Sequence, residues 1–120
     1  MRVVNLAERF GRFSEHWSPR IVGEVNDMHV KVAKLSGEFV WHHHDDEDEL
    51  FLVMEGRLSI RFRTGDREVG PGEFIVVPRG VEHCPVALTD EVRVVLLEPK
   101  TTVNTGNVNS ERTVALPERL

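Results

Sequence analysis

The chain has no tyrosine, a single cysteine and no long apolar run. Its one cysteine, Cys84, cannot form a disulfide within the chain, so packing and hydrogen bonds must hold the fold together. No apolar stretch approaches the roughly 20 residues that a membrane-spanning helix needs, and the first residues lack the long apolar stretch of a signal peptide. We therefore expect a cytoplasmic protein with no membrane partner.

Positive charge is also scarce, because 15 Lys and Arg residues stand against 20 Asp and Glu residues, giving a formal net charge of -5. A nucleic-acid surface needs clustered basic residues, and the arginines between Arg57 and Arg67 fall on strand and turn positions that should face outward. Nucleic acid is therefore not an expected partner. The length of 120 residues and the 40% apolar content suit one small domain over residues 1–120.

Short apolar runs separated by glycine, proline and acidic turns fill most of the chain. The pattern predicts eight strands, at residues 21–25, 28–35, 38–44, 49–55, 57–63, 74–78, 83–88 and 91–98. Residues 5–12 are predicted to form one or two helical turns that end at Gly11. The core barrel is expected at about residues 28–98, with the N-terminal segment and the C-terminal tail as cover. The tail, residues 101–120, is expected either as a strap over the barrel or as a partly disordered segment.

Two histidines one residue apart form the most informative local pattern. Side chains alternate between the two faces of a strand, so His42 and His44 should point the same way while His43 points away. Glu49 lies an odd number of residues beyond His44. It can join the two histidines only if the acidic run at residues 45–48 turns the chain and a new strand begins.

These residues, together with a distant histidine, resemble the two sequence motifs of the cupin superfamily. The first motif, a glycine, His-x-His, a glutamate and another glycine, is matched by Gly37, His42, His44, Glu49 and Gly56. The second motif, a glycine, Pro-x-Gly and a histidine, is matched by Gly72, Pro78, Gly80 and His83. The resemblance covers roughly residues 30 to 98 and implies an all-β fold, a double-stranded β-helix of the jelly-roll barrel type.

The chain departs from these motifs at two points. The spacing before the first histidine is one residue shorter than in the motif. A register shifted to His43 would place Asp45 in the second ligand position and displace the downstream glutamate and glycine, so the register with His42 and His44 is preferred. Ala87 stands where the second motif has an asparagine, which bears on the polarity of the pocket and not on the ligands.

The resemblance implies that His42, His44, Glu49 and His83 bind one divalent transition metal. Neutral imidazoles and one carboxylate suit Fe, Mn, Ni, Cu or Zn, and the lack of thiol ligands argues against a structural zinc site. Four protein ligands on an octahedral ion would leave two positions open. Open positions allow a metal to bind a water, a chelating small molecule or dioxygen.

Two classes of function are compatible with such a site. One is a metal-dependent enzyme acting on a small oxygen-rich molecule, either a dioxygenase of a chelating diketone or enol or an isomerase or epimerase of a sugar-like carbonyl compound. The other is a non-catalytic module that binds a small ligand through its metal. Strand alternation predicts no inward carboxylate besides Glu49, with Lys34 as a polar exception if its strand keeps register. Oxygen or Lewis-acid chemistry is therefore favoured over proton abstraction.

Residues 50–54 and 92–97 are apolar at positions facing both ways. Strands of this kind are covered on both faces in folded proteins. The outer row on the first of them consists of Leu50, Leu52 and Met54. We expect the N-terminal segment around Phe10, Phe13 and Trp17 to cover part of this row, and a second subunit to cover the rest as a homodimer.

The chosen register predicts a distinct pattern of metal loss. His44→Ala and His83→Ala each remove a ligand, so the metal content of the purified protein should drop steeply. His43→Ala alters the opposite face and should leave the metal content nearly unchanged. Metal analysis of the three variants checks this, and equal losses from all of them would contradict the register.

Overall fold

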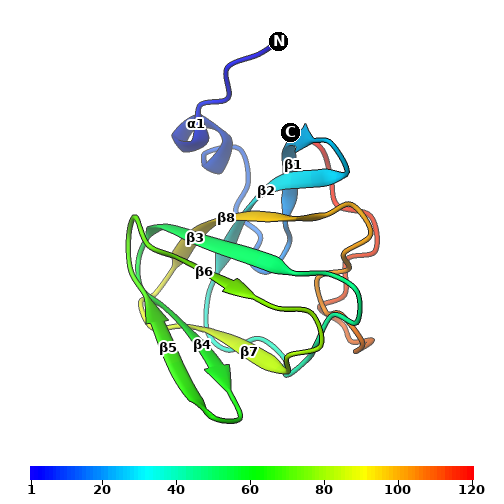
Figure 1. Ribbon diagram of the computed structural model, residues 1–120. Helices are drawn as coiled ribbons and strands as arrows, with labels where there is room; N and C mark the ends of the chain where they lie inside the picture. Colours follow the sequence, from blue (N-terminus) through cyan, green and yellow to red (C-terminus); the bar gives the residue numbers. More distant parts are fainter.

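The computed structural model describes residues 1–120 and contains eight β-strands and one short α-helix (Figure 1). The strands are β1 (Arg20–Val25), β2 (Met28–Leu35), β3 (Glu49–Glu55), β4 (Leu58–Phe62), β5 (Gly65–Val69), β6 (Phe74–Val77), β7 (His83–Ala87) and β8 (Val92–Pro99). Helix α1 spans Leu6–Phe10; Asn5 caps its start by accepting a hydrogen bond from the N–H of Glu8, and Gly11 ends it as predicted. This helix is far too short to cross a membrane, and the structure holds no other.

The strands form two antiparallel sheets that face each other as the walls of a jelly-roll barrel (Figure 1). One sheet has the strand order β1-β2-β8-β3-β6, and the other has the order β5-β4-β7. Strand β3 pairs with both β6 and β8, so distant parts of the chain lie next to each other. The prediction of an all-β jelly-roll fold is confirmed.

The core lies between the two sheets and is built from alternate residues of the strands. Its members are Trp17, Ala33, Leu35, Phe51, Val53, Leu58, Ile60, Val69, Val77, Val92, Val94 and Leu96. Val92, Val94 and Leu96 show the alternation along β8. Full burial of each large apolar side chain contributes about 1.5–3 kcal/mol to the stability of the fold.

A second cluster covers the outer face of the five-stranded sheet. Phe10 and Phe13 of the N-terminal segment pack there on Val32 of β2 and Val95 of β8. Leu52 of β3 packs against the same cluster and is half-buried. Part of the outer apolar row is therefore covered within the chain, as expected for the two phenylalanines.

Trp17 lies on the opposite side of this sheet from Phe13, so its expected place in the outer cover was wrong. Its backbone adopts a φ of 58°, in the left-handed region, which redirects the side chain. The ring Nε1–H donates to the carbonyl of Ser36 at 2.8 Å, and the ring stacks on Phe39 with centroids 4.5 Å apart. The indole thus joins the main core through a backbone reversal that the residue pattern does not reveal.

Two predicted strand assignments differ from the structure. Residues 38–44 are not a strand; they form only isolated bridges, from Glu38 to Val86 and from His42 to His83. Conversely, residues 65–69, for which the pattern predicts no strand, form β5, which pairs with β4. The pattern missed β5 because it is an edge strand whose residues are mostly exposed and polar, without the alternation of a half-buried strand.

The C-terminal strap, defined as residues 101–120, returns from the end of β8 to β1. Figure 1 shows this orange to red segment running along the side of the barrel. At its end, the N–H of Ile21 donates to the carbonyl of Glu118 and the N–H of Leu120 donates to the carbonyl of Ile21, both at 2.8 Å. Of the two alternatives for the tail, the strap is the one observed.

Candidate metal centre

Four side chains from separate parts of the chain converge inside the barrel. His42 and His44 lie on the extended segment before β3, Glu49 begins β3 and His83 begins β7. All four residues are buried, and their potential ligand atoms lie within 4.8 Å of one another. The structure thus brings together the four residues that the two motifs single out, in a cluster that could hold a metal ion.

Local hydrogen bonds orient two of the histidine rings in the same way. Nδ1 of His42 lies 2.8 Å from the carbonyl oxygen of Val40, and Nδ1 of His83 lies 2.9 Å from that of Val81. A carbonyl can only accept, so Nδ1 carries the proton in both rings and Nε2 keeps its lone pair. This is the arrangement that typically supports a metal-binding imidazole.

Unpaired nitrogen atoms provide the test of whether a metal fits. Nε2 of His44 and Nε2 of His83 are buried and have no hydrogen-bond partner. They lie 3.5 Å and 3.7 Å from Oε1 of Glu49, beyond ordinary hydrogen-bond length. Buried polar atoms without partners are rare because their desolvation is costly. One cation bound between these nitrogen and oxygen atoms would satisfy all of them. This set of ligand atoms therefore fits a divalent transition metal.

The pKa values in the cluster favour the protonation states that ligands need. Burial, with a further contribution from His83, lowers the pKa of His42 to about 4, so this imidazole is neutral at neutral pH. Burial alone would raise the pKa of Glu49, but its close contacts with Glu98, His44 and His83 outweigh the burial and hold the pKa well below its usual value. A neutral imidazole and an ionised carboxylate are the metal-binding forms of these groups.

His43 points away from the cluster, as the alternation predicts. Its Nε2 lies 2.8 Å from Oδ1 of Asp45, and both side chains are partly exposed. The alternation therefore persists in residues 38–44 although they form no continuous strand. In this structure the alternative register, with His43 and Asp45 as ligands, does not bring its residues into the barrel.

A second buried carboxyl group lies beside Glu49, where the sequence pattern predicts none. Glu98 of β8 is 1% exposed and lines the same cavity as Glu49 and His42. The ammonium group of Lys31 donates to Oε1 of Glu98 at 2.7 Å. The expectation of a single inward carboxylate was wrong. Glu98 follows Val92, Val94 and Leu96 in the set of alternate β8 residues that point inward. Strand alternation alone could therefore have predicted that Glu98 points inward.

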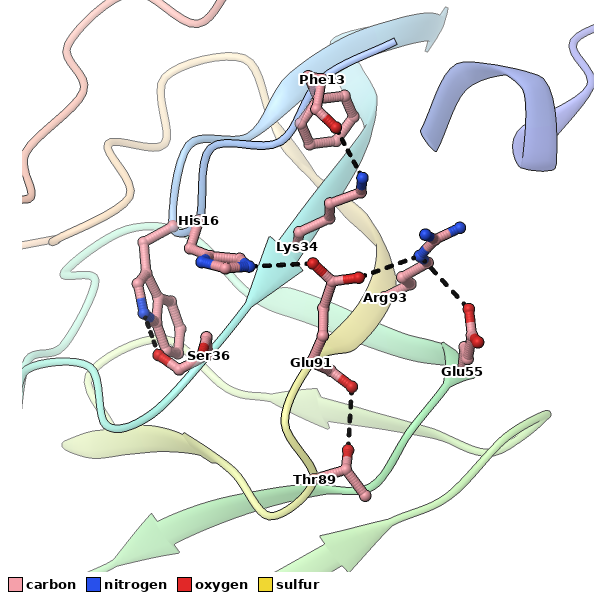
Figure 2. Close-up of polar contacts among 9 residues, drawn as sticks. Phe13, His16, Lys34, Ser36, Glu55, Thr89, Glu91 and Arg93 are labelled. Carbon is pink, nitrogen blue, oxygen red and sulfur yellow. Dashed lines mark hydrogen bonds and ion pairs between the residues drawn. The ribbon is translucent and has the colours of Figure 1, made fainter. Parts of the chain in front are cut away.

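Lys34, the polar residue expected in the pocket, lies outside it. Ala33 and Leu35 line the cavity, so Lys34 between them faces the other way, and its Nζ donates to the carbonyl of Phe13 at 2.6 Å (Figure 2). Lys31 shares the inward parity of Ala33 and Leu35 and is 2% exposed. The polar residue of β2 that points inward is therefore Lys31, three residues before the expected Lys34.

The two neighbouring carboxyl groups have opposite pKa shifts. Burial first, and then the carboxylate of Glu49, raise the pKa of Glu98 well above its usual value, while Lys31 opposes the shift. Two carboxyl groups in contact within a low-dielectric interior do not both ionise readily. Of the two, Glu49 therefore ionises more readily and Glu98 keeps its proton more readily.

The cluster borders a cavity of about 30 Å³. This volume holds one or two water molecules but no organic ligand. The walls include Phe51 of β3 and Pro85 of β7, and also Trp17, Phe39 and Asn104 from segments outside the strands. A ligand larger than water can enter only if some of these walls move.

A family model described as Cupin domain matches residues 28–99. The match covers more than half of the chain and includes all four residues of the cluster. The chain therefore belongs to the cupin domain family, which confirms the resemblance of its two motifs.

Known proteins are similar to the whole or to part of this chain. A crystal structure of a cupin-2 domain containing protein from Shewanella frigidimarina superimposes with a TM-score of 0.79 at 47% identity, covering 82% of this chain and 95% of that chain. YdbB, an uncharacterized protein from Bacillus subtilis (strain 168), is 43% identical over 63 residues, 52% of this chain. Acireductone dioxygenase from Rhodopseudomonas palustris (strain TIE-1) is 40% identical over 47 residues, 36% of this chain. The matches span 56% of YdbB and 28% of the dioxygenase.

The Lys31–Glu98 contact predicts a strong coupling between the two residues. Glu98→Leu leaves the buried ammonium group of Lys31 without its hydrogen-bond acceptor, so it should lower the free energy of unfolding by about 1–3 kcal/mol. Adding Lys31→Met removes the stranded charge, so the double variant should recover most of the loss. Urea unfolding of the wild type, both single variants and the double variant measures the coupling. Additive losses would show that the two side chains are independent.

Proposed function

We propose that this cupin binds one divalent transition metal through His42, His44, Glu49 and His83, and that it is a metal-dependent enzyme of the dioxygenase type acting on a small oxygen-rich molecule. The observation that carries the proposal is the pair of buried, unpartnered Nε2 atoms of the cluster, facing an ionised carboxylate beside a cavity. When bound, the metal would supply Lewis acidity and affinity for oxygen donors.

The lining of the cavity favours a compact substrate with neighbouring oxygen atoms, which would enter once some of the walls move. Its walls are mainly apolar and aromatic, so a ligand would find few polar partners apart from the cluster and Glu98. A carboxyl group can donate or accept a hydrogen bond. Glu98 could therefore hold a hydroxyl or carbonyl oxygen of a molecule whose adjacent oxygen is bound by the metal, and Lys31 keeps the Glu98 side chain in place.

The similarity to acireductone dioxygenase favours the dioxygenase type among the possible reactions. Its name gives the substrate of that enzyme as an acireductone, and the matched segment covers 28% of the enzyme. Such a partial match supports only a class of reaction, the oxygen-dependent conversion of a small molecule. The substrate of this chain must be identified by experiment.

An isomerase or epimerase of a sugar-like carbonyl compound is the second candidate. Glu98 is the observation that favours it, because proton transfer at carbon needs a positioned group such as a carboxyl. A non-catalytic module that binds a small ligand through its metal is the remaining alternative. It would use the same four ligands and would differ by the lack of turnover.

Metal analysis followed by activity screening tests the proposed function. The protein is purified without added metal and without a histidine tag, analysed for bound metals, and then loaded in turn with Fe, Mn, Ni, Cu and Zn. We expect about one metal per chain and metal-dependent dioxygen uptake with small enediols or diketones. The double variant Lys31→Met with Glu98→Leu should keep the metal but slow the uptake by at least about tenfold, as expected for loss of a positioned hydrogen bond in an active site.

Each other result selects a different function. Turnover of sugar-like carbonyl compounds without dioxygen uptake, followed by NMR, would replace the dioxygenase by the isomerase or epimerase. Ligand binding that needs the metal but gives no turnover would leave the non-catalytic module. Failure of the wild type to bind any of these metals would reject the proposed function as a whole.

We also propose that the protein forms a homodimer through the outer face of β3 and β6. Phe74, Val76 and Met54 are exposed there, beside half-buried Leu50 and Leu52. These residues lie on the same face, because Leu50 pairs with Val76 and Leu52 pairs with Phe74. A second copy would remove this apolar patch from water.

Sedimentation at micromolar concentration tests the dimer. Phe74→Asp should convert it to a monomer, since Phe74 is 63% exposed and its replacement disturbs no core contact. Leu88→Asp is the matched control, because Leu88 is also exposed but follows β7 in the other sheet. A wild-type protein that sediments as a soluble monomer would contradict the proposal.

A further inference from the structure

The C-terminal strap contacts the segment that carries two of the candidate ligands. The N–H of Asn107 donates to the carbonyl of His43 at 3.0 Å, and the N–H of His43 donates to Oδ1 of Asn107 at 2.8 Å. One residue of the strap therefore satisfies both backbone groups of the residue between His42 and His44. The strap lies outside residues 28–99, the part of the chain that the family model matches.

The backbone of the ligand segment has a different partner on its other edge. His42 exchanges two backbone hydrogen bonds with His83, at 3.0 Å and 2.8 Å, and the carbonyl of His44 accepts one from the N–H of Gly80 at 2.7 Å. In an extended chain, the backbone groups of successive residues point to opposite edges. Residues of the barrel thus satisfy the backbone groups of His42 and His44, whereas Asn107 of the strap satisfies those of His43.

Gly106 shows how closely the strap approaches this segment. A Cβ atom at this position would lie 2.1 Å from the carbonyl oxygen of His43 and 3.1 Å from Cδ2 of His42. The first distance is far inside van der Waals contact, and φ is +55°, which a side chain disfavours. Only glycine fits here without moving the strap away from the candidate ligands.

The strap is itself braced by internal contacts, so it can present Asn107 in a fixed position. Thr105 is fully buried; its hydroxyl donates to the carbonyl of Val108 at 2.6 Å and lies 2.7 Å from the hydroxyl of Thr113. The hydroxyl of Thr113 also accepts a hydrogen bond from the N–H of Ser110 at 3.0 Å. None of these contacts reaches the histidine segment.

We propose that Gly106 and Asn107 are positioning residues for the metal centre. They clamp the backbone at His43 and so fix the relative placement of the His42 and His44 rings. The clamp should slow the release of a bound metal, because the two histidines cannot move apart while the strap is docked. The effect on metal rests on the proposed metal site, whereas the clamp on the His43 backbone does not.

Asn107→Ala tests the clamp with two readouts. The first is hydrogen exchange of the His43 amide in metal-free protein, which should accelerate at least about fivefold when the Oδ1 acceptor is lost. The second is release of cobalt from Co²⁺-loaded protein to excess chelator, which should become about three- to tenfold faster. Asn107→Asp keeps an acceptor oxygen at the same place and should restore both rates toward those of the wild type.

Thr113→Val is the matched control within the strap. It removes hydrogen bonds to Thr105 and Ser110 but none to the histidine segment, so it reports the effect of loosening the strap internally. Gly106→Ala should exceed Asn107→Ala in both readouts, because its methyl group displaces the strap backbone. Its folding is checked by the far-UV circular dichroism of the barrel.

The possible outcomes separate the clamp from the proposed function. Unchanged His43 exchange in Asn107→Ala, or equal changes in Thr113→Val, would overturn the clamp. Faster His43 exchange with unaltered cobalt release would show a purely structural strap and overturn the role in positioning ligands. A wild type that retains no cobalt would reject the proposed metal site, while the exchange readout would still test the backbone contact.

Discussion

The geometry of the candidate centre depends on one constraint, the reciprocal pair of backbone hydrogen bonds between His42 and His83. These bonds join two segments that are far apart in the sequence and set their imidazole rings 4.3 Å apart. The barrel supplies the rest of the geometry, because β3 delivers Glu49 and the acidic turn lets His44 approach it. Without this pairing, residues 38–44 would have only the bridge at Glu38 to hold them to a sheet.

Much of the architecture could be predicted because strand alternation and turn residues are local signals. Alternation grouped His42 with His44, and the resemblance to the two motifs added Glu49 and His83. These local signals failed where contacts between distant parts of the chain determine the structure. β5 is a polar edge strand, and Trp17 turns inward through a positive φ. Neither feature leaves an apolar pattern in the residues.

Glu98 and Lys31 illustrate a different limit. Each occupies a strand position whose side chain points inward, so strand alternation could have predicted its burial. A charged residue, however, is ordinarily expected to face solvent. The interior can accept them because they meet each other at 2.7 Å, and that pairing joins β2 to its neighbour β8. A long-range contact of this kind becomes visible only when strand order and register are known.

The buried lysine also sets the electrostatic character of the barrel interior. The positive charge of Lys31 offsets the negative charge of Glu49, whose pKa is lowered, while the raised pKa of Glu98 favours its uncharged form. The charge of a divalent ion would then stand almost uncompensated in a medium of low dielectric constant, where such a charge is costly. With such an ion bound, a molecule that binds as an enolate or a carboxylate would gain an advantage over a neutral one of the same shape.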